Sequence, residues 1–144
     1  MDKQNCKSRK VFYNEYMADQ KKILVVDDEQ DMLDLYGAVL KSADFDVTTA
    51  LNGPEGIKQA KALHPDLVLL DFKMPDMDGI EVLGKLKEDP ATKDVRIVFF
   101  SAFGDRSVNL IDEQAAKEIG ALAFIQKGIG NDELVQKIKQ ILAS

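Results

Sequence analysis

The chain has 144 residues and a formal net charge of −6, with 19 Lys and Arg against 25 Asp and Glu. This length favours a single domain, and no apolar run approaches the roughly 18 residues of a membrane-spanning helix. The single cysteine excludes an internal disulfide framework. Because the N-terminus also lacks the apolar core of a signal peptide, we expect a cytoplasmic protein with no membrane association.

The charge is unevenly distributed along the chain. Residues 1–22 carry six Lys or Arg and three Asp or Glu, whereas residues 23–144 carry thirteen and twenty-two. We interpret residues 1–21 as an N-terminal extension, disordered rather than a docking arm, and residues 22–144 as the folded domain. Since the folded part is acidic, we do not expect direct DNA binding through a broad basic face.

Five apolar or β-branched segments alternate with amphipathic segments. The segments predicted as strands are 22–26, 45–50, 67–71, 95–100 and 121–126. One predicted helix directly follows the first strand, and the last one follows residue 130. The three between them run from about 53 to 64, 79 to 88 and 107 to 119. This alternation predicts an α/β fold with a five-stranded parallel sheet, right-handed crossovers and helices on both faces.

Helical spacing predicts which residues of these helices face the core. In the first helix the apolar positions at offsets 0, 3, 4, 7 and 8 are Met32, Leu35, Tyr36, Val39 and Leu40. In the helix from 79 to 88 the expected apolar stripe is Ile80, Leu83 and Leu86.

Polar side chains follow four of the predicted strands. Asp27 and Asp28 follow the first, Asp71 ends the third, Ser101 follows the fourth and Lys127 follows the fifth. The carboxyl ends of the strands in an open parallel sheet form the edge where ligands bind. One acid at such a position usually caps a helix, but three carboxylates, a hydroxyl and an ammonium together predict a site.

Three carboxylates that lie close together repel one another and raise one another's pKa. A hard divalent cation such as Mg²⁺ removes this conflict and also accepts a phosphate oxygen as a ligand. A carboxylate can in addition attack a phosphoryl group and form an aspartyl-phosphate. Lys127 would then supply positive charge, and Ser101 a hydrogen-bond donor, to the phosphoryl oxygens.

With these residues, the sequence resembles the receiver domain of two-component response regulators over residues 22–143. The matching motifs are Asp27-Asp28, Asp71 before Met74-Pro75 and Asp78-Gly79, Ser101-Ala102, and Lys127. The resemblance implies the flavodoxin-like receiver fold with strand order 2-1-3-4-5.

The resemblance also assigns roles around the acids. Asp71 would be the phosphoacceptor. The expected cofactor is Mg²⁺ or Mn²⁺, bound by Asp28, by Asp71 and by the backbone carbonyl of Lys73, with Asp27 acting through a water molecule. Ser101 and Lys127 would bind the phosphoryl oxygens.

A conformational switch is implied as well. Ser101 would move toward the phosphoryl group, and the ring of Phe124 would follow it inward. This motion would remodel the face formed by residues 107–119, the fifth strand and the last helix, as a shift between two existing populations. The family usually has Pro after the conserved Lys, whereas Gly128 follows Lys127 here. We therefore expect a more flexible loop at this point.

The expected function is that of a stand-alone receiver that is not an enzyme acting on another substrate. Its partners would be a sensor histidine kinase or phosphotransfer protein and a downstream protein effector. The downstream route stays open between a chemotaxis-type regulator, a phosphorelay intermediate and a regulator of a separate effector. Two alternatives are a phosphorylation-independent binding module with the same fold and a small phosphohydrolase that uses Asp71 as nucleophile.

Overall fold

The computed structural model describes residues 20–102, 118 and 120–143. These residues contain five parallel strands: β1 (Lys22–Val26), β2 (Asp46–Ala50), β3 (Leu67–Asp71), β4 (Arg96–Ser101) and β5 (Ala123–Gln126). They form one sheet in the order β2-β1-β3-β4-β5. The predicted sheet and its strand order are therefore confirmed, although β5 begins two residues later than the sequence pattern indicated.

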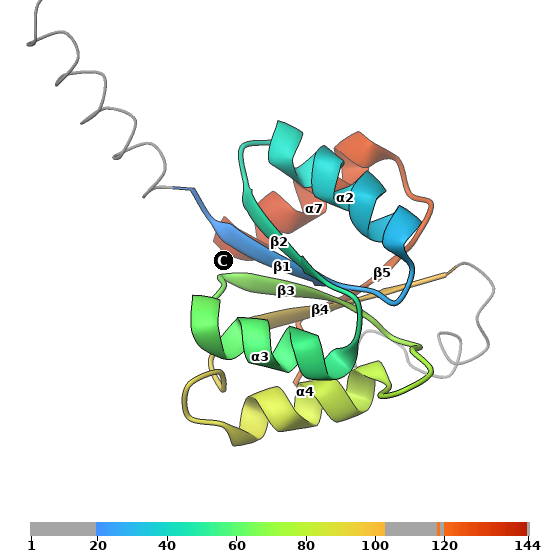
Figure 1. The fold of residues 1–144 in the computed structure, drawn as a ribbon. Coiled ribbons are helices and arrows are strands. Elements are labelled where there is room, and N and C mark those ends of the chain that lie inside the picture. The colour runs from blue at the N-terminus through green and yellow to red at the C-terminus, as the bar shows by residue number, and fades with distance from the viewer. Residues whose placement is uncertain (1–19, 103–117, 119, 144) are drawn as a thin grey trace, which may run out of the picture.

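Helices cover both faces of this sheet. Helices α2 (Gln30–Ser42) and α7 (Asn131–Ala143) lie on one face, and α3 (Gly53–Leu63) and α4 (Gly79–Glu88) lie on the other (Figure 1). The predicted extension up to residue 19 and the helix predicted at 107–119, apart from residue 118, lie outside the described residues. Among the described helices, none combines the length and hydropathy that a bilayer crossing needs.

The central strand β3 is buried along its whole length, because helices pack against both of its faces. Its side chains alternate between two cores, as the pleat of a strand requires. Val68 and Leu70 belong to the core under α3 and α4. Leu67 and Leu69 belong to the core under α2 and α7.

Two of the predicted helix faces are wrong in part. Leu35 is 47% exposed, whereas Leu33, which the prediction left out, is 2% exposed. The stripe that α2 buries is Leu33, Tyr36, Gly37 and Leu40. This stripe has the same helical offsets as the predicted one, but it includes a glycine, which a hydrophobicity pattern does not count as apolar.

In α4 the correction has a simple geometric cause. Ile80 is 43% exposed, and the buried large side chains are Val82, Leu83 and Leu86. Ile80 precedes Val82 by two residues, and a separation of two residues places side chains on nearly opposite sides of a helix. Burial of Val82 therefore turns Ile80 toward solvent.

The start of α4 is packed tightly against the end of β3. Asp78 caps the helix, since its carboxylate accepts a hydrogen bond from the Glu81 N–H at 2.9 Å. At Gly79 an added Cβ would lie 2.9 Å from the carbonyl oxygen of Asp71 and 2.9 Å from the Cα of Phe72. Glycine at this position therefore lets α4 approach the chain next to Asp71.

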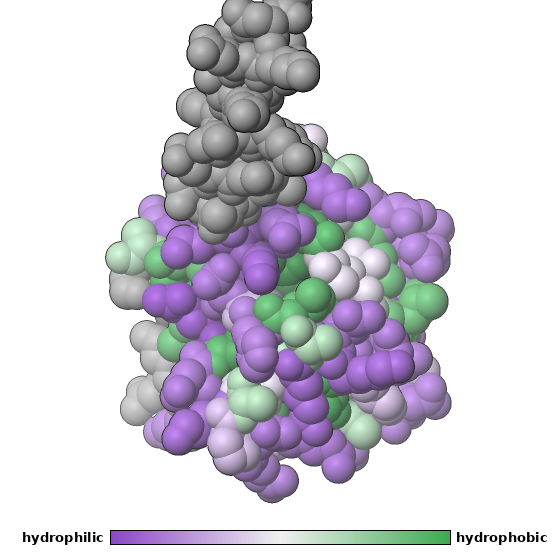
Figure 2. All heavy atoms as spheres, turned by 60° about the vertical axis from the view of Figure 1, so that its left-hand side comes forward, coloured by the Kyte–Doolittle hydropathy of each residue, from purple (hydrophilic) through white to green (hydrophobic). Residues whose placement is uncertain are grey.

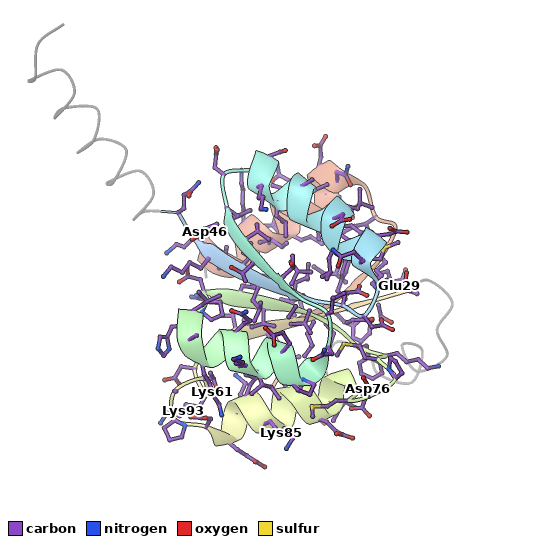
Figure 3. All side chains as sticks on the ribbon, in the orientation of Figure 1. Glu29, Asp46, Lys61, Asp76, Lys85 and Lys93 are labelled. Atoms are coloured by element: carbon purple, nitrogen blue, oxygen red, sulfur yellow. The ribbon has the colours of Figure 1, made fainter. Side chains whose placement is uncertain are left out.

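The opposite edge of the sheet, where the strands begin, looks different. Figure 2 brings this side forward and shows a mainly hydrophilic surface with small, separate apolar areas. Asp46, which starts β2, lies at this edge (Figure 3). The face gives no sign of a large apolar docking surface among the described residues, so the polar cluster at the other edge is the stronger candidate site.

Candidate functional site

Three carboxylates meet at the carboxyl ends of β1 and β3. One oxygen atom from each of Asp27, Asp28 and Asp71 lies within 4.8 Å of the others. Parallel pairing of Val26 with Leu70 brings Asp27 and Asp71, the next residues on the two strands, to the same edge. Asp27 and Asp71 are 2% and 4% exposed, whereas Asp28 faces solvent. Figure 3 shows Glu29, which follows these acids, at this end of the sheet.

Lys127 delivers a positive charge to the cluster from the end of β5. Its Nζ lies 2.6 Å from Oδ2 of Asp27 and 3.6 Å from Oδ2 of Asp71, and its side chain is 12% exposed. Burial alone would lower the pKa of Lys127. The hydrogen bond to Asp27 and the negative charges of Asp71, Asp27 and Glu29 outweigh burial and raise the pKa, so the ammonium stays charged at neutral pH.

Asp71 has an unusual ionisation for an aspartate. Burial, together with the negative charge of Asp27, raises the pKa of its carboxyl from 3.8 to about 7. The charge of Lys127 and the hydrogen bond from the Lys73 N–H, at 3.4 Å, oppose this rise without cancelling it. The charged form of Asp71 is therefore disfavoured as long as no further positive charge reaches the cluster.

Asp27 is held in place from two sides. Its Oδ1 accepts a hydrogen bond from the Glu29 N–H at 3.0 Å, while its Oδ2 contacts Lys127. Its own backbone N–H donates to the carbonyl of Ala50 at the end of β2. These contacts fix the carboxylate at the edge of the sheet before any ligand binds.

The donor set fits a hard divalent cation. It consists of carboxylate oxygens, and the ammonium of Lys127 balances only part of their charge. Mg²⁺ prefers oxygen ligands and keeps several waters, which the exposed side of Asp28 would allow. Lys73 is exposed, and its backbone N–H donates a hydrogen bond to the carboxylate of Asp71 in the cluster. The metal role of its carbonyl, and the separate roles predicted for the three acids, stay predictions.

The two residues predicted to form the switch lie on adjacent strands. Ser101 ends β4 and is 1% exposed. Its backbone carbonyl accepts a hydrogen bond of 2.6 Å from the Lys127 N–H. Phe124 in β5 is half-buried, with ring centroids 5.6 Å from Phe72 and 5.9 Å from Phe99. The ring of Phe124 therefore packs toward the core in this structure.

Sequence reasoning missed two aromatic residues at the site. The ring of Phe100 lies beneath the ammonium of Lys127, with 5.9 Å between Nζ and the ring centroid. The hydroxyl of Tyr36 in α2 accepts a hydrogen bond from the Gly128 N–H. The sequence pattern places Tyr36 on the apolar face of the first helix and Phe100 within the fourth strand, and it assigns neither residue a role at the site. The sequence does show that Phe100 directly precedes Ser101 and that Tyr36 lies in the helix after Asp27 and Asp28.

Comparison with known proteins gives one consistent family. The family model for the response regulator receiver domain matches residues 23–139. The response regulator PleD of Caulobacter vibrioides is 36% identical over 120 residues, which are 83% of this chain but 26% of PleD. The chain thus spans about a quarter of that relative. Sporulation initiation phosphotransferase F of Bacillus subtilis is 35% identical over 121 residues, covering 84% of this chain and 93% of that protein.

Solved structures agree with this result. A CheY-like receiver domain protein from Methanospirillum hungatei has a TM-score of 0.74 at 27% identity, covering 86% of this chain and 94% of that one. The chemotaxis protein CheY4 of Vibrio cholerae has a TM-score of 0.73 at 22% identity, covering 85% and 98%, which shows the shared fold. With its strand order, its acidic cluster and the match over residues 23–139, the chain belongs to the response regulator receiver domain family.

Proposed function

We propose that this receiver domain is a Mg²⁺-dependent switch that accepts a phosphoryl group on Asp71. The observation that carries the proposal is the position of the Asp71 carboxylate. It lies at the open edge of the sheet, beside two further acids and 3.6 Å from the ammonium of Lys127. A nucleophile and a positive charge are the main requirements of phosphoryl transfer, because little other covalent chemistry is needed.

The transfer itself can be written with the residues of this chain. An oxygen of ionised Asp71 attacks phosphorus and forms a new P–O bond, while the bond from phosphorus to the donor breaks. The electron pair of that bond leaves with the donor group. Lys127 stabilises the charge on the phosphoryl oxygens, and the hydroxyl of Ser101 donates a hydrogen bond to one of them.

A divalent cation would be held by the carboxylates of Asp28 and Asp71 and the backbone carbonyl of Lys73, with Asp27 acting through a water molecule. When bound, Mg²⁺ or Mn²⁺ supplies positive charge to the phosphoryl oxygens. The pKa of Asp71, raised to about 7 without a cation, supports this assignment. A cation at the cluster favours the ionised carboxylate, which is the form that acts as nucleophile.

Phosphorylation would act on partners through Ser101 and Phe124. Movement of Ser101 toward the phosphoryl group would draw the ring of Phe124 further in, and the face that includes β5 and α7 would change. The predicted contribution of residues 107–119 to this face lies, apart from residue 118, outside the described residues. We expect the donor to be a sensor histidine kinase or a phosphotransfer protein in the cytoplasm, and the recipient of the signal to be a protein effector.

Relatives of this chain differ in their output. One is named a sporulation initiation phosphotransferase, and another, RpaA of Synechocystis, a DNA-binding transcriptional regulator. The chain covers 48% of the length of RpaA. For this receiver domain we propose signalling through protein contact, without direct DNA binding and without enzymatic action on another substrate.

The test is the intact mass of the protein after incubation with acetyl phosphate. Wild type should gain one phosphoryl group with Mg²⁺ and none with a chelator, and Asp71→Asn should gain none. Asp76→Asn is the matched control, because Asp76 is an exposed acid five residues further along, in the loop that follows β3. Failure of wild type to gain mass would overturn the proposal and favour a binding module that works without phosphorylation. Turnover of a generic phosphoester, abolished by Asp71→Asn, would instead indicate a phosphohydrolase.

A further inference from the structure

The loop after β5 carries Lys127 into the site and departs from the usual family sequence directly after it. Gly128 stands where the family usually has proline. Its φ of +93° lies in the region that favours glycine, and nothing lies within 4 Å of the position a Cβ would occupy. The loop therefore lacks the ring that would stiffen it and needs another means of fixing Lys127.

A hydrogen bond to helix α2 provides such a means. The Gly128 N–H donates to the hydroxyl of Tyr36 at 3.3 Å, across 92 residues of sequence. Tyr36 lies in α2 and is 5% exposed, so its ring is fixed by packing and only the hydroxyl reaches the loop. Proline has no N–H to donate. This contact is therefore available because residue 128 is not proline.

The ring of Tyr36 also packs against the aromatic ring that lies under the ammonium of Lys127. It packs edge-on against Phe100, with 4.6 Å between centroids and an interplanar angle of 82°. Phe100 in turn lies under the Nζ of Lys127 at 5.9 Å. Tyr36 thus contacts the backbone that follows Lys127 and the aromatic ring beneath its charged end.

Lys127 is consequently held at three points. Its own N–H donates to the carbonyl of Ser101, the next N–H donates to Tyr36, and its ammonium rests between Phe100 and the acids. The first of these contacts is backbone to backbone and is independent of the side chain at position 36. The second exists only if residue 36 offers a hydroxyl.

We propose that Tyr36 is a positioning residue, whose hydroxyl fixes the loop at Gly128 so that the ammonium of Lys127 points at Asp27 and Asp71. This inference rests on the proposed phosphoryl switch for its effect on rate, but the position of the ammonium can be measured without phosphorylation. It predicts that loss of the hydroxyl oxygen at residue 36 changes the position of the Lys127 ammonium, although Tyr36 lies in α2 and Lys127 follows β5.

The decisive variant is Tyr36→Phe, which removes the hydroxyl and keeps the ring on Phe100. In nitrogen-15 NMR spectra of the metal-free protein, the side-chain ammonium signal of Lys127 should be sharp in wild type and broadened or lost in Tyr36→Phe. The Gly128 amide should exchange faster with solvent in the variant. Leu40→Val is the matched control, because Leu40 is a fully buried residue of the same helix without a polar atom in its side chain. It should leave both signals unchanged.

The rate of phosphoryl uptake from acetyl phosphate at saturating Mg²⁺ gives the second readout. Tyr36→Phe should slow uptake by about threefold to tenfold, the range expected for loss of one neutral hydrogen bond. In a Lys127→Ala background the same change should have no further effect, since the tyrosine acts through Lys127. A purely structural role would slow both backgrounds equally.

The outcomes separate this inference from the proposed function. If wild type takes up no phosphoryl group, the proposed function fails and the NMR comparison alone decides the role of Tyr36. An unchanged Lys127 signal in Tyr36→Phe would overturn the positioning role in either case. An equal slowing of uptake with Lys127 present and in the Lys127→Ala background would overturn it as well.

Discussion

The ammonium of Lys127 lies 2.6 Å from Oδ2 of Asp27, although the strands that precede these residues are not neighbours in the sheet. Strands β3 and β4 lie between β1 and β5. The pair therefore spans the carboxyl edge of the sheet, and both side chains are largely buried. Contacts that join separate strands across a buried edge make the site sensitive to the loss of either charge.

Removal of the ammonium should destabilise the metal-free protein. In Lys127→Met the carboxylates of Asp27 and Asp71 lose their shared counter-charge, and we expect a loss of about 3 kcal/mol in the free energy of unfolding. Urea unfolding at pH 8 with a chelator measures this loss. Lys137→Met is the control, because its pair with Glu133 is exposed and 3.9 Å long. It should change stability by no more than about 0.5 kcal/mol. An equal effect of the two variants would contradict the account.

Removal of the charge at residue 71 should have the opposite effect. Asp71→Asn replaces a carboxylate whose ionised form is disfavoured, so we expect the metal-free protein to gain about 1–2 kcal/mol at pH 8. Thermal unfolding in a chelator measures the gain, and added Mg²⁺ should stabilise wild type more than the variant. Asp46→Asn, at an exposed position at the start of β2, should change little. A loss of stability in Asp71→Asn would show that the charged carboxylate is favourable.

The raised pKa of Asp71 also sets the direction of a pH dependence. The folded protein binds this proton with a pKa of about 7, against 3.8 for the ordinary carboxyl. The folded state therefore holds more protons between these values, and stability from this group is lost as the pH rises from about 4 to about 7. Unfolding midpoints in urea with a chelator, compared between wild type and Asp71→Asn, should differ most above pH 7 and converge near pH 4. A constant difference across this range would place the pKa elsewhere.

Two glycines in α4 should respond in opposite ways to the same change. Gly79→Ala places a methyl group 2.9 Å from the carbonyl oxygen of Asp71, so we expect a loss of about 2 kcal/mol and a displaced loop next to the site. Gly84 lies in the middle of the same helix with nothing within 4 Å of its Cβ position. Gly84→Ala should therefore gain about 0.5–1 kcal/mol. Denaturant unfolding measures both, and a stable Gly79→Ala protein would contradict the packing described.

Much of the fold and the site could be predicted from the sequence, because the apolar runs of the central strands end at polar residues. The apolar run before Asp27 and the one before Asp71 both stop at a carboxylate, and parallel pairing brings these ends together whatever the details of the helices. The strand order itself came from the family resemblance rather than from alternation. The structure and the family match bear it out.

The errors and omissions have physical causes. Leu35 and Ile80 were placed on buried faces because apolar spacing fixes a helix stripe only to within about one residue, and only the packed sheet selects the correct one. The hydroxyl of Tyr36 was missed because its partner, the Gly128 N–H, is a backbone group 92 residues away. No local pattern records such a contact. The predicted domain limits and the separate roles of the site residues stay predictions.

The most direct test of the central claim is to locate the phosphoryl group on the chain. After incubation with acetyl phosphate and Mg²⁺, reduction with borohydride converts an aspartyl-phosphate to homoserine, which peptide mass spectrometry assigns to one position. We expect this product at residue 71 alone, and we expect it to disappear when a chelator replaces Mg²⁺. Its appearance at residue 27 or 28, or its absence from a protein that binds Mg²⁺, would contradict the assignment of Asp71 as the phosphoacceptor.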